Sequence, residues 1–140
     1  MTNIPKWILP ALSALGEQEI PGPAANSFIS DCLSSVKQPG NDEIAWCSAF
    51  VNKMMIVAGI PGTNSAAVRS WLTWGKELSF FQFGCVAVFR RPPDPTGGHV
   101  AFGFGVWGDS IICLGGNQSD RVKFSLYPKS DLLGYRFPNT

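Results

Sequence analysis

Residues 46–59 read WCSAFVNKMMIVAG, the most regular stretch of the chain. Its apolar side chains recur three or four positions apart, which predicts an amphipathic helix from Cys47 to Ala58 that ends at Gly59. A cysteine therefore opens a helix, where free backbone N–H groups carry partial positive charge. This position would lower the pKa of the thiol, favour the thiolate and supply donors for an oxyanion.

Shorter helices are expected on both sides of this segment. On the N-terminal side, one covers residues 7–15, and another runs from a cap at Asn26 or Ser27 to about residue 36. Downstream, a further helix is expected over residues 65–74, ahead of Gly75. The first half of the chain is thus predicted to be helical.

The second half changes to the period of two that is typical of β-strands. The pair Gly108-Asp109 is a turn signal, and loops are expected at residues 91–95 and from Gly115-Gly116 onward. Helices followed by an antiparallel meander make the fold class α+β, in one domain over residues 1–140. Strands are expected over residues 85–89, 99–107, 110–114, 122–126 and 133–137.

The composition excludes several classes of function. The net charge of +1 on 140 residues lacks the basic field that non-specific nucleic-acid binding needs. No run reaches the roughly 18 apolar residues of a membrane span, and the N-terminus does not follow a signal-peptide pattern. Four cysteines without a CxxC pair and one histidine do not fit a zinc site, so we expect free thiols, no metal and no cofactor. No heptad pattern indicates an oligomer, and a monomer is expected.

The single histidine, His99, begins the alternating strand and is the candidate base for Cys47. The residues that share its side of the strand are Ala101, Gly103 and Gly105, all of them small. Glycines in a strand often mark the close approach of another backbone. We therefore expect the helix of Cys47 to pack on this small face, with the large apolar residues facing another part of the core.

A third residue should orient the imidazole, and the hairpin register restricts the choice to two amides. If the turn pairs Val106 with Ile111, His99 lies opposite Gln118; if it pairs Val106 with Ser110, His99 lies opposite Asn117. Either amide oxygen can accept a hydrogen bond from the ring. We favour Asn117 and keep Gln118 as the alternative.

The segments WCSAFV at residues 46–51 and GGHVAF at residues 97–102 resemble the papain-like peptidoglycan hydrolases of the NlpC and CHAP (cysteine, histidine-dependent amidohydrolase/peptidase) superfamily. The resemblance implies a papain-like fold in which the nucleophile helix packs on an antiparallel sheet. It also implies Cys47 as nucleophile, His99 as base and Asn117 as the orienting residue. Further segments are similar to a small single-domain branch common in bacteriophage genes: residues 21–23, 42–43, 67–72, 114–119 and 133–136.

The resemblance implies an endolysin that cuts an amide bond in the peptide part of peptidoglycan. His99 would take the thiol proton and later give it to the leaving amine, and the backbone N–H groups of Cys47 and Ser48 would stabilise the oxyanion. The candidates for contact with the substrate are Asp42, Glu43, Trp46, Arg69, Trp71 and Gln118.

Two alternatives stay open. The same chemistry could serve an interbacterial toxin effector, or the chain could be a catalytically inactive module that binds the cell wall. For the hydrolase we expect synthesis in a host cytoplasm without a signal peptide and action on the wall in the periplasm. A holin-type release or a delivery system would then carry the protein there.

Overall fold

The computed structural model describes residues 4–18, 27–36 and 46–139, with the backbone alone for residues 94–97. Helices come first along the chain, as α1 (Ile8–Ser13), α2 (Ser27–Ser34), α3 (Cys47–Val57) and the 3-10 helix η1 (Val68–Thr73). The strands follow, as β1 (Lys76–Leu78), β2 (Val86–Arg91), β3 (Asp94–Trp107), β4 (Ser110–Gln118), β5 (Arg121–Pro128) and β6 (Leu132–Phe137), with the 3-10 turn η2 (Lys129–Asp131) before β6. The described parts of the chain form an α+β structure.

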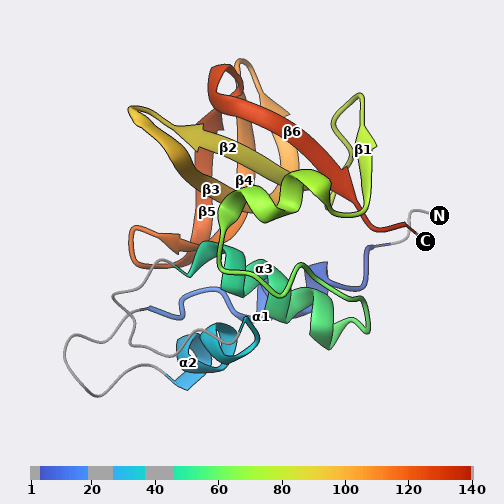
Figure 1. Cartoon of the computed structure of the whole chain (residues 1–140), viewed down its shortest axis with the longest axis vertical. Coiled ribbons are helices and arrows are strands. Elements are labelled where there is room, and N and C mark those ends of the chain that lie inside the picture. Colours follow the sequence, from blue (N-terminus) through green and yellow to red (C-terminus); the bar gives the residue numbers. More distant parts are fainter. Residues whose placement is uncertain (1–3, 19–26, 37–45, 140) are drawn as a thin grey trace.

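The six strands form one antiparallel sheet in the order β1-β6-β2-β3-β4-β5. Strands β2 to β5 follow one another as the predicted meander, but β6 returns across the molecule to pair with β2 (Figure 1). The short strand β1, which the sequence pattern does not predict, then extends the edge beside β6. The return of β6 therefore places the last strand of the chain between β1 and β2, the first two strands.

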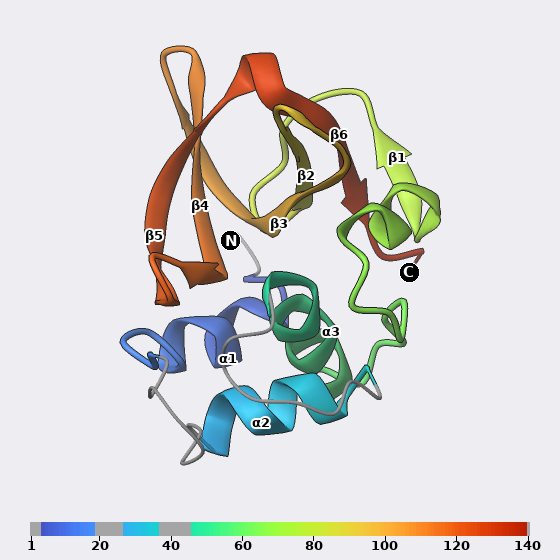
Figure 2. The same ribbon diagram turned by 60° about the vertical axis from the view of Figure 1, so that its left-hand side comes forward.

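Helices α1, α2 and α3 lie together beneath a strongly curved sheet (Figure 2). Helix α3 is the one that lies between the sheet and the other two. It contacts β3 and β4 on one side and α1 and α2 on the other. The helix predicted over residues 47–58 is confirmed by α3, but nearly every side chain in its first nine positions is buried, so this part lacks the exposed face of an amphipathic helix. A helix that is apolar on most of its faces belongs inside a core.

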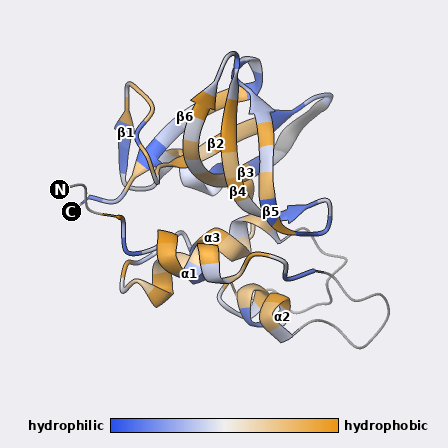
Figure 3. Cartoon of the chain, turned by 180° about the vertical axis from the view of Figure 1, so that it is seen from behind, coloured by the Kyte–Doolittle hydropathy of each residue, from blue (hydrophilic) through white to orange (hydrophobic). Residues whose placement is uncertain are grey.

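The sheet buries apolar residues on both faces. Val88, Val100 and Phe102 belong to the cluster that packs on the helices, whereas Phe89 and Ala101 belong to a second cluster inside the curve of the sheet. The hydrophobic colour accordingly covers the central strands and the helices beneath them (Figure 3). The prediction that the small face of β3 meets the helix is therefore wrong. Large side chains bury more apolar area against the helices than small ones would.

The close approach of α3 to the sheet occurs at Gly116 on β4. A Cβ there would lie 2.6 Å from the ring of Trp46 and 2.8 Å from Cβ of Phe50. The glycine pair at residues 115–116 thus continues a strand, where the sequence pattern predicts a loop, because the missing side chains leave room for the core.

Two other local predictions also differ from the structure. The helix expected over residues 65–74 is the shorter η1, whose N-terminal approach is held instead by polar contacts to α3. The loop expected at residues 91–95 shrinks to a turn at Pro92 and Pro93, since β2 ends at Arg91 and β3 begins at Asp94.

We predict that Gly116→Ala lowers the free energy of unfolding by about 2 kcal/mol, because the added methyl group overpacks a fully buried contact. Urea unfolding of the two proteins measures the difference. The matched control is Gly105→Ala on β3, where a Cβ would meet only Cδ1 of Ile112, at 3.7 Å. Equal losses in the two variants would show that the contact between α3 and β4 is looser than described.

Candidate active site

Cys47 is the first residue of α3, and a polar network anchors the turn that carries it. The Ser48 hydroxyl donates to the carbonyl oxygen of Ser65 (2.7 Å) and accepts a hydrogen bond from the indole N–H of Trp71 (2.9 Å). The Asn52 amide donates to the carbonyl oxygen of Ser48 (3.0 Å). These bonds tie the N-terminal turn of α3 to the segment around η1, so the position of the thiol is set by two parts of the chain.

Burial dominates the electrostatics of the Cys47 thiol. The side chain is enclosed, and desolvation raises its pKa above the ordinary value. Backbone N–H groups of Val100, Ser48 and Cys47 itself, together with the charge of Arg91, act in the opposite direction but do not offset burial. The prediction of a lowered thiol pKa is therefore wrong for this structure. The thiol lies at the N–H of Val100, on the face of β3 that packs on the helices, whereas His99 stacks on Tyr127 on the other face.

His99 lies on β3 opposite Phe89 and is almost fully buried. Its Nε2 is 2.8 Å from Oε1 of Gln118. The amide nitrogen of Gln118 donates to the carbonyl oxygens of Lys123 (2.6 Å) and Cys113 (3.4 Å). Only an NH₂ group can donate to two carbonyls, so the amide oxygen faces the ring and Nε2 carries the ring hydrogen.

The other ring nitrogen of His99 is left available as a base. Nδ1 is buried and has no hydrogen-bond partner among the residues that the structure describes. Burial lowers the pKa of His99 to about 4, with a further lowering by the charge of Arg91 and a partial compensation by the Gln118 bond. The imidazole is therefore neutral at pH 7, with the lone pair on Nδ1.

Gln118, and not the favoured Asn117, orients the ring. The turn pairs Val106 with Ile111, as in the alternative that predicted Gln118. Two irregularities then intervene, one on β3 at residues 103–105 and one on β4 at residues 115–118. At the second, Asn117 takes a left-handed backbone conformation (φ 58°), and the following side chain reaches the imidazole. Bulges of this kind shift the register without a sequence signal that a count of residues can detect.

Two residues near the site were not predicted. The ring of Tyr127 on β5 stacks on the imidazole of His99, with 4.6 Å between centroids. Arg91, exposed at the end of β2, is the cation whose charge acts on Cys47, His99 and Tyr127 alike. Neither carries a local signal, because Arg91 comes near His99 through the pairing of β2 with β3, and Tyr127 of β5 through the curvature of the sheet.

The residues predicted to contact the substrate differ in their burial. Trp46 and Trp71 are fully buried and belong to the core, so the prediction that they line a cleft is wrong. Arg69 is half-buried on η1. Asp42 and Glu43 lie outside the described residues. The two large aromatic rings near the start of α3 pack in the core.

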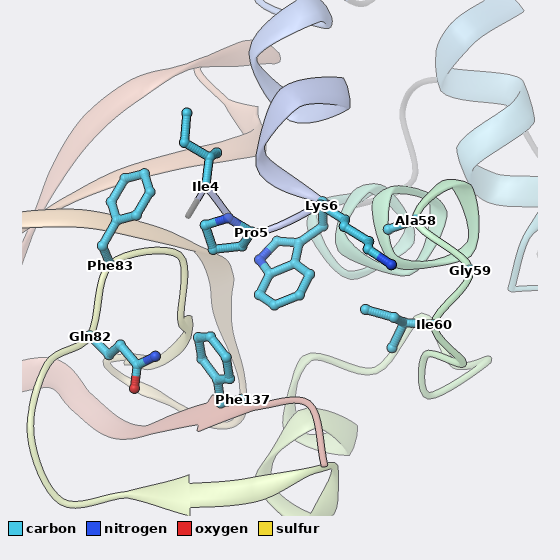
Figure 4. A pocket seen from close by; sticks show the side chains of 10 residues that line it. Ile4, Pro5, Lys6, Ala58, Gly59, Ile60, Gln82, Phe83 and Phe137 are labelled. Carbon is cyan, nitrogen blue, oxygen red and sulfur yellow. The ribbon is translucent and has the colours of Figure 1, made fainter. Parts of the chain in front are cut away.

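A pocket of about 790 Å³ lies at the opposite end of α3 from Cys47 (Figure 4). It is lined by the residues around the start of α1, the end of α3, the approach to β2 and the end of β6, among them Lys6, Ile60, Phe83 and Phe137. No thiol or imidazole is among its lining residues. The chemical candidate and this pocket are therefore separate features of the molecule.

The neutral state of His99 predicts a pH dependence of stability. The pKa of about 4 in the folded state lies below the ordinary 6.5, so between these values the unfolded chain binds a proton that the folded chain does not. The free energy of unfolding should fall as the pH drops from about 6.5 to about 4, by about 3 kcal/mol in total. Urea unfolding of the wild type and of His99→Gln over this range isolates the effect, because other groups titrate in both. A constant difference between the two proteins would contradict a buried neutral histidine.

Within the described residues, no group of three or more His, Cys, Asp or Glu side chains is placed to hold a metal ion. None of the helices described is both long enough and apolar enough to cross a membrane. In comparisons with known proteins, the chain matches no family model and no curated protein.

Proposed function

We propose that this chain is a cysteine hydrolase of papain-like fold that cuts an amide bond in the peptide part of bacterial peptidoglycan. The observation that carries the chemistry is the state of His99. Its Nε2 is oriented by Gln118, while Nδ1 is buried and has no partner among the described residues. A buried polar atom without a hydrogen bond costs about 1–3 kcal/mol, and of the two such side-chain atoms in the described residues, Nε1 of Trp46 and Nδ1 of His99, only Nδ1 can accept a proton.

In the proposed reaction the thiol proton moves to Nδ1 of His99 as Sγ of Cys47 attacks the amide carbonyl carbon. The N–H groups of Cys47 and Ser48 stabilise the oxyanion of the tetrahedral intermediate. The C–N bond then breaks, the imidazolium gives its proton to the leaving amine, and a thioester remains. Water, deprotonated by His99, attacks the thioester and releases the acid and the thiol.

The first step of the proposed reaction requires a movement of the thiol and the imidazole toward each other. The thiol lies by the N–H of Val100, and Nδ1 of His99 is still without a partner in the described structure. Because Val100 and His99 face opposite sides of β3, the thiol and the imidazole must approach each other before the proton can pass. Catalytic hydrogen bonds are often long or absent without substrate and tighten when it binds. Burial opposes the transfer, because it raises the pKa of the thiol and lowers the pKa of the imidazole, so the proposed step requires substrate binding to change the surroundings of both groups.

The substrate class is supported by the sequence resemblance of residues 46–51, 97–102 and 114–119 to peptidoglycan hydrolases. Within this class an endolysin is the proposed role. What supports His99 as the base of this proposal is its arrangement, a neutral imidazole oriented by Gln118 with Nδ1 unpaired among the described residues. The same arrangement would serve a toxin effector with an identical reaction.

The test is incubation of the purified, reduced protein with isolated Gram-negative sacculi, followed by mass spectrometry of the soluble products. Released fragments with a new amino terminus would support the proposal, and their masses would identify the bond. Folded, reduced protein that frees no fragments would contradict the hydrolase. If that protein nevertheless sediments with the sacculi, a module that binds the wall becomes the better description.

A further inference from the structure

The ring of Tyr127 lies nearly parallel to the imidazole of His99. The centroids are 4.6 Å apart and the planes differ by 17°. Phe89, the residue opposite His99 on β2, stacks on Tyr127 in turn, at 5.1 Å and 30°. The imidazole is thus part of a group of three stacked rings inside the curve of the sheet.

Strand pairing alone does not produce this stack. Tyr127 is on β5 and His99 on β3, with β4 between them. The register places Tyr127 opposite Ile111, whereas Gln118 pairs near the other end of β5, with Arg121. The Tyr127 ring reaches His99 because the sheet is strongly curved (Figure 2), so that side chains of β5 and β3 meet across β4. Gln118 and Tyr127 are far apart along the β4–β5 pair, but both contact the imidazole of His99.

We propose that Tyr127 is a positioning residue for His99, whose ring holds the imidazole plane and keeps water from the bond between Nε2 and Gln118. One hydrogen bond fixes one atom of the ring but lets the plane swing, and the terminal torsion of histidine is broad. A flat stack removes that freedom. With the plane and Nε2 both set, Nδ1 is the nitrogen left for the thiol of Cys47.

The aromatic face, and not the hydroxyl, carries this role. Burial raises the pKa of Tyr127 to about 12, so the side chain stays uncharged beside Cys47 and His99. When His99 takes the thiol proton, the π face of the tyrosine ring is favourable for the imidazolium. Tyr127→Phe should therefore keep the function, and removal of the ring should not.

The consequence for rate rests on the proposed hydrolase function, but the effect on His99 is measurable without any substrate. Because the chain has one histidine, long-range ¹H–¹⁵N spectra contain a single imidazole. In the wild type and in Tyr127→Phe we expect one tautomer, protonated at Nε2, that resists protonation at mildly acidic pH. In Tyr127→Ala we expect a mixture of tautomers and a pKa at least one unit higher, because water reaches the ring.

The matched control is Tyr135→Ala. Tyr135 belongs to the same inner cluster but packs edge-on against Phe81, at 5.9 Å and 82°, and has no ring contact with His99 among those described. This variant should leave the tautomer and the pKa of His99 unchanged. If Tyr127→Ala does not fold, Tyr127→Leu, which fills much of the volume without an aromatic face, takes its place.

On sacculi, we expect kcat of Tyr127→Ala to fall by about ten- to a hundredfold with KM unchanged, and Tyr127→Phe to stay within about twofold. The proposal is overturned if a folded Tyr127 variant without the ring keeps the wild-type tautomer and pKa, or if Tyr135→Ala changes them as much. If the wild type releases nothing from sacculi, the hydrolase proposal fails, and the spectra still decide the role of Tyr127.

Discussion

Cys47→Ala is expected to stop the release of fragments from sacculi, with a fall in rate of at least about 10³-fold. Without Sγ no thioester forms, and the remaining hydrogen-bond donors cannot supply a nucleophile. The side chain is small and sits at the first position of α3, so alanine keeps the helix and its core contacts. The measurement is the initial rate of fragment release, with circular dichroism to show that the variant is folded.

The control for Cys47→Ala is Cys32→Ala, the same substitution at a buried free thiol on α2. Burial raises the pKa of Cys32 to about 12, and nothing places it beside His99. This variant should retain the wild-type rate. Fragment release by Cys47→Ala at the wild-type rate would remove Cys47 as the nucleophile, and loss of activity in both variants would point to a general effect of thiol removal.

Replacement of Gln118 by Leu should lower kcat by about 10²-fold or more, because a histidine in the wrong tautomer cannot accept the thiol proton. Leucine fills the space but leaves Nε2 of His99 and the carbonyl oxygens of Lys123 and Cys113 without their partner. Loss of these buried bonds should also cost stability, about 1–3 kcal/mol. Rates measured below the unfolding range, together with urea unfolding, separate the two effects.

Asn117→Gly is the paired variant that tests the orienting residue. Glycine accepts the left-handed backbone that Asn117 adopts, so the strand should keep its path. We expect nearly wild-type kcat, since the amide bonded to the ring is that of Gln118. A larger loss in Asn117→Gly than in Gln118→Leu would show that the register at this point of β4 differs from the one described.

Helices and strands could be predicted from the sequence where their pattern arises from residues close together in the chain. The apolar spacing from Cys47 to Ala58 gives α3 within one residue of its observed end, and the alternation after His99 gives most of β3. The positions of Cys47 at the start of a helix and of His99 in a strand are of the same kind, because each follows from a local period. The register of the β3–β4 hairpin restricted the candidates for the residue that orients His99 to Asn117 and Gln118.

Other properties of the site depend on where distant residues meet. Which face of β3 packs on α3 follows from the burial of Val100 and Phe102, and no period distinguishes one face from the other. The direction of the pKa shift of Cys47 follows from enclosure by β3, whereas a helix N-terminus taken alone predicts the opposite. Both errors come from local rules applied where burial by distant segments has the stronger effect.

By itself, the sequence determined the order of the elements, the helix that begins at Cys47, the single histidine and the two amides that could orient it. Only the tertiary structure decided between those amides, turned His99 away from the helices, buried Trp46 and Trp71, and brought Tyr127 onto the imidazole. The reason is physical: helix and strand periods arise from interactions a few residues apart. Bulges, sheet curvature and desolvation arise only when segments distant in the chain pack together.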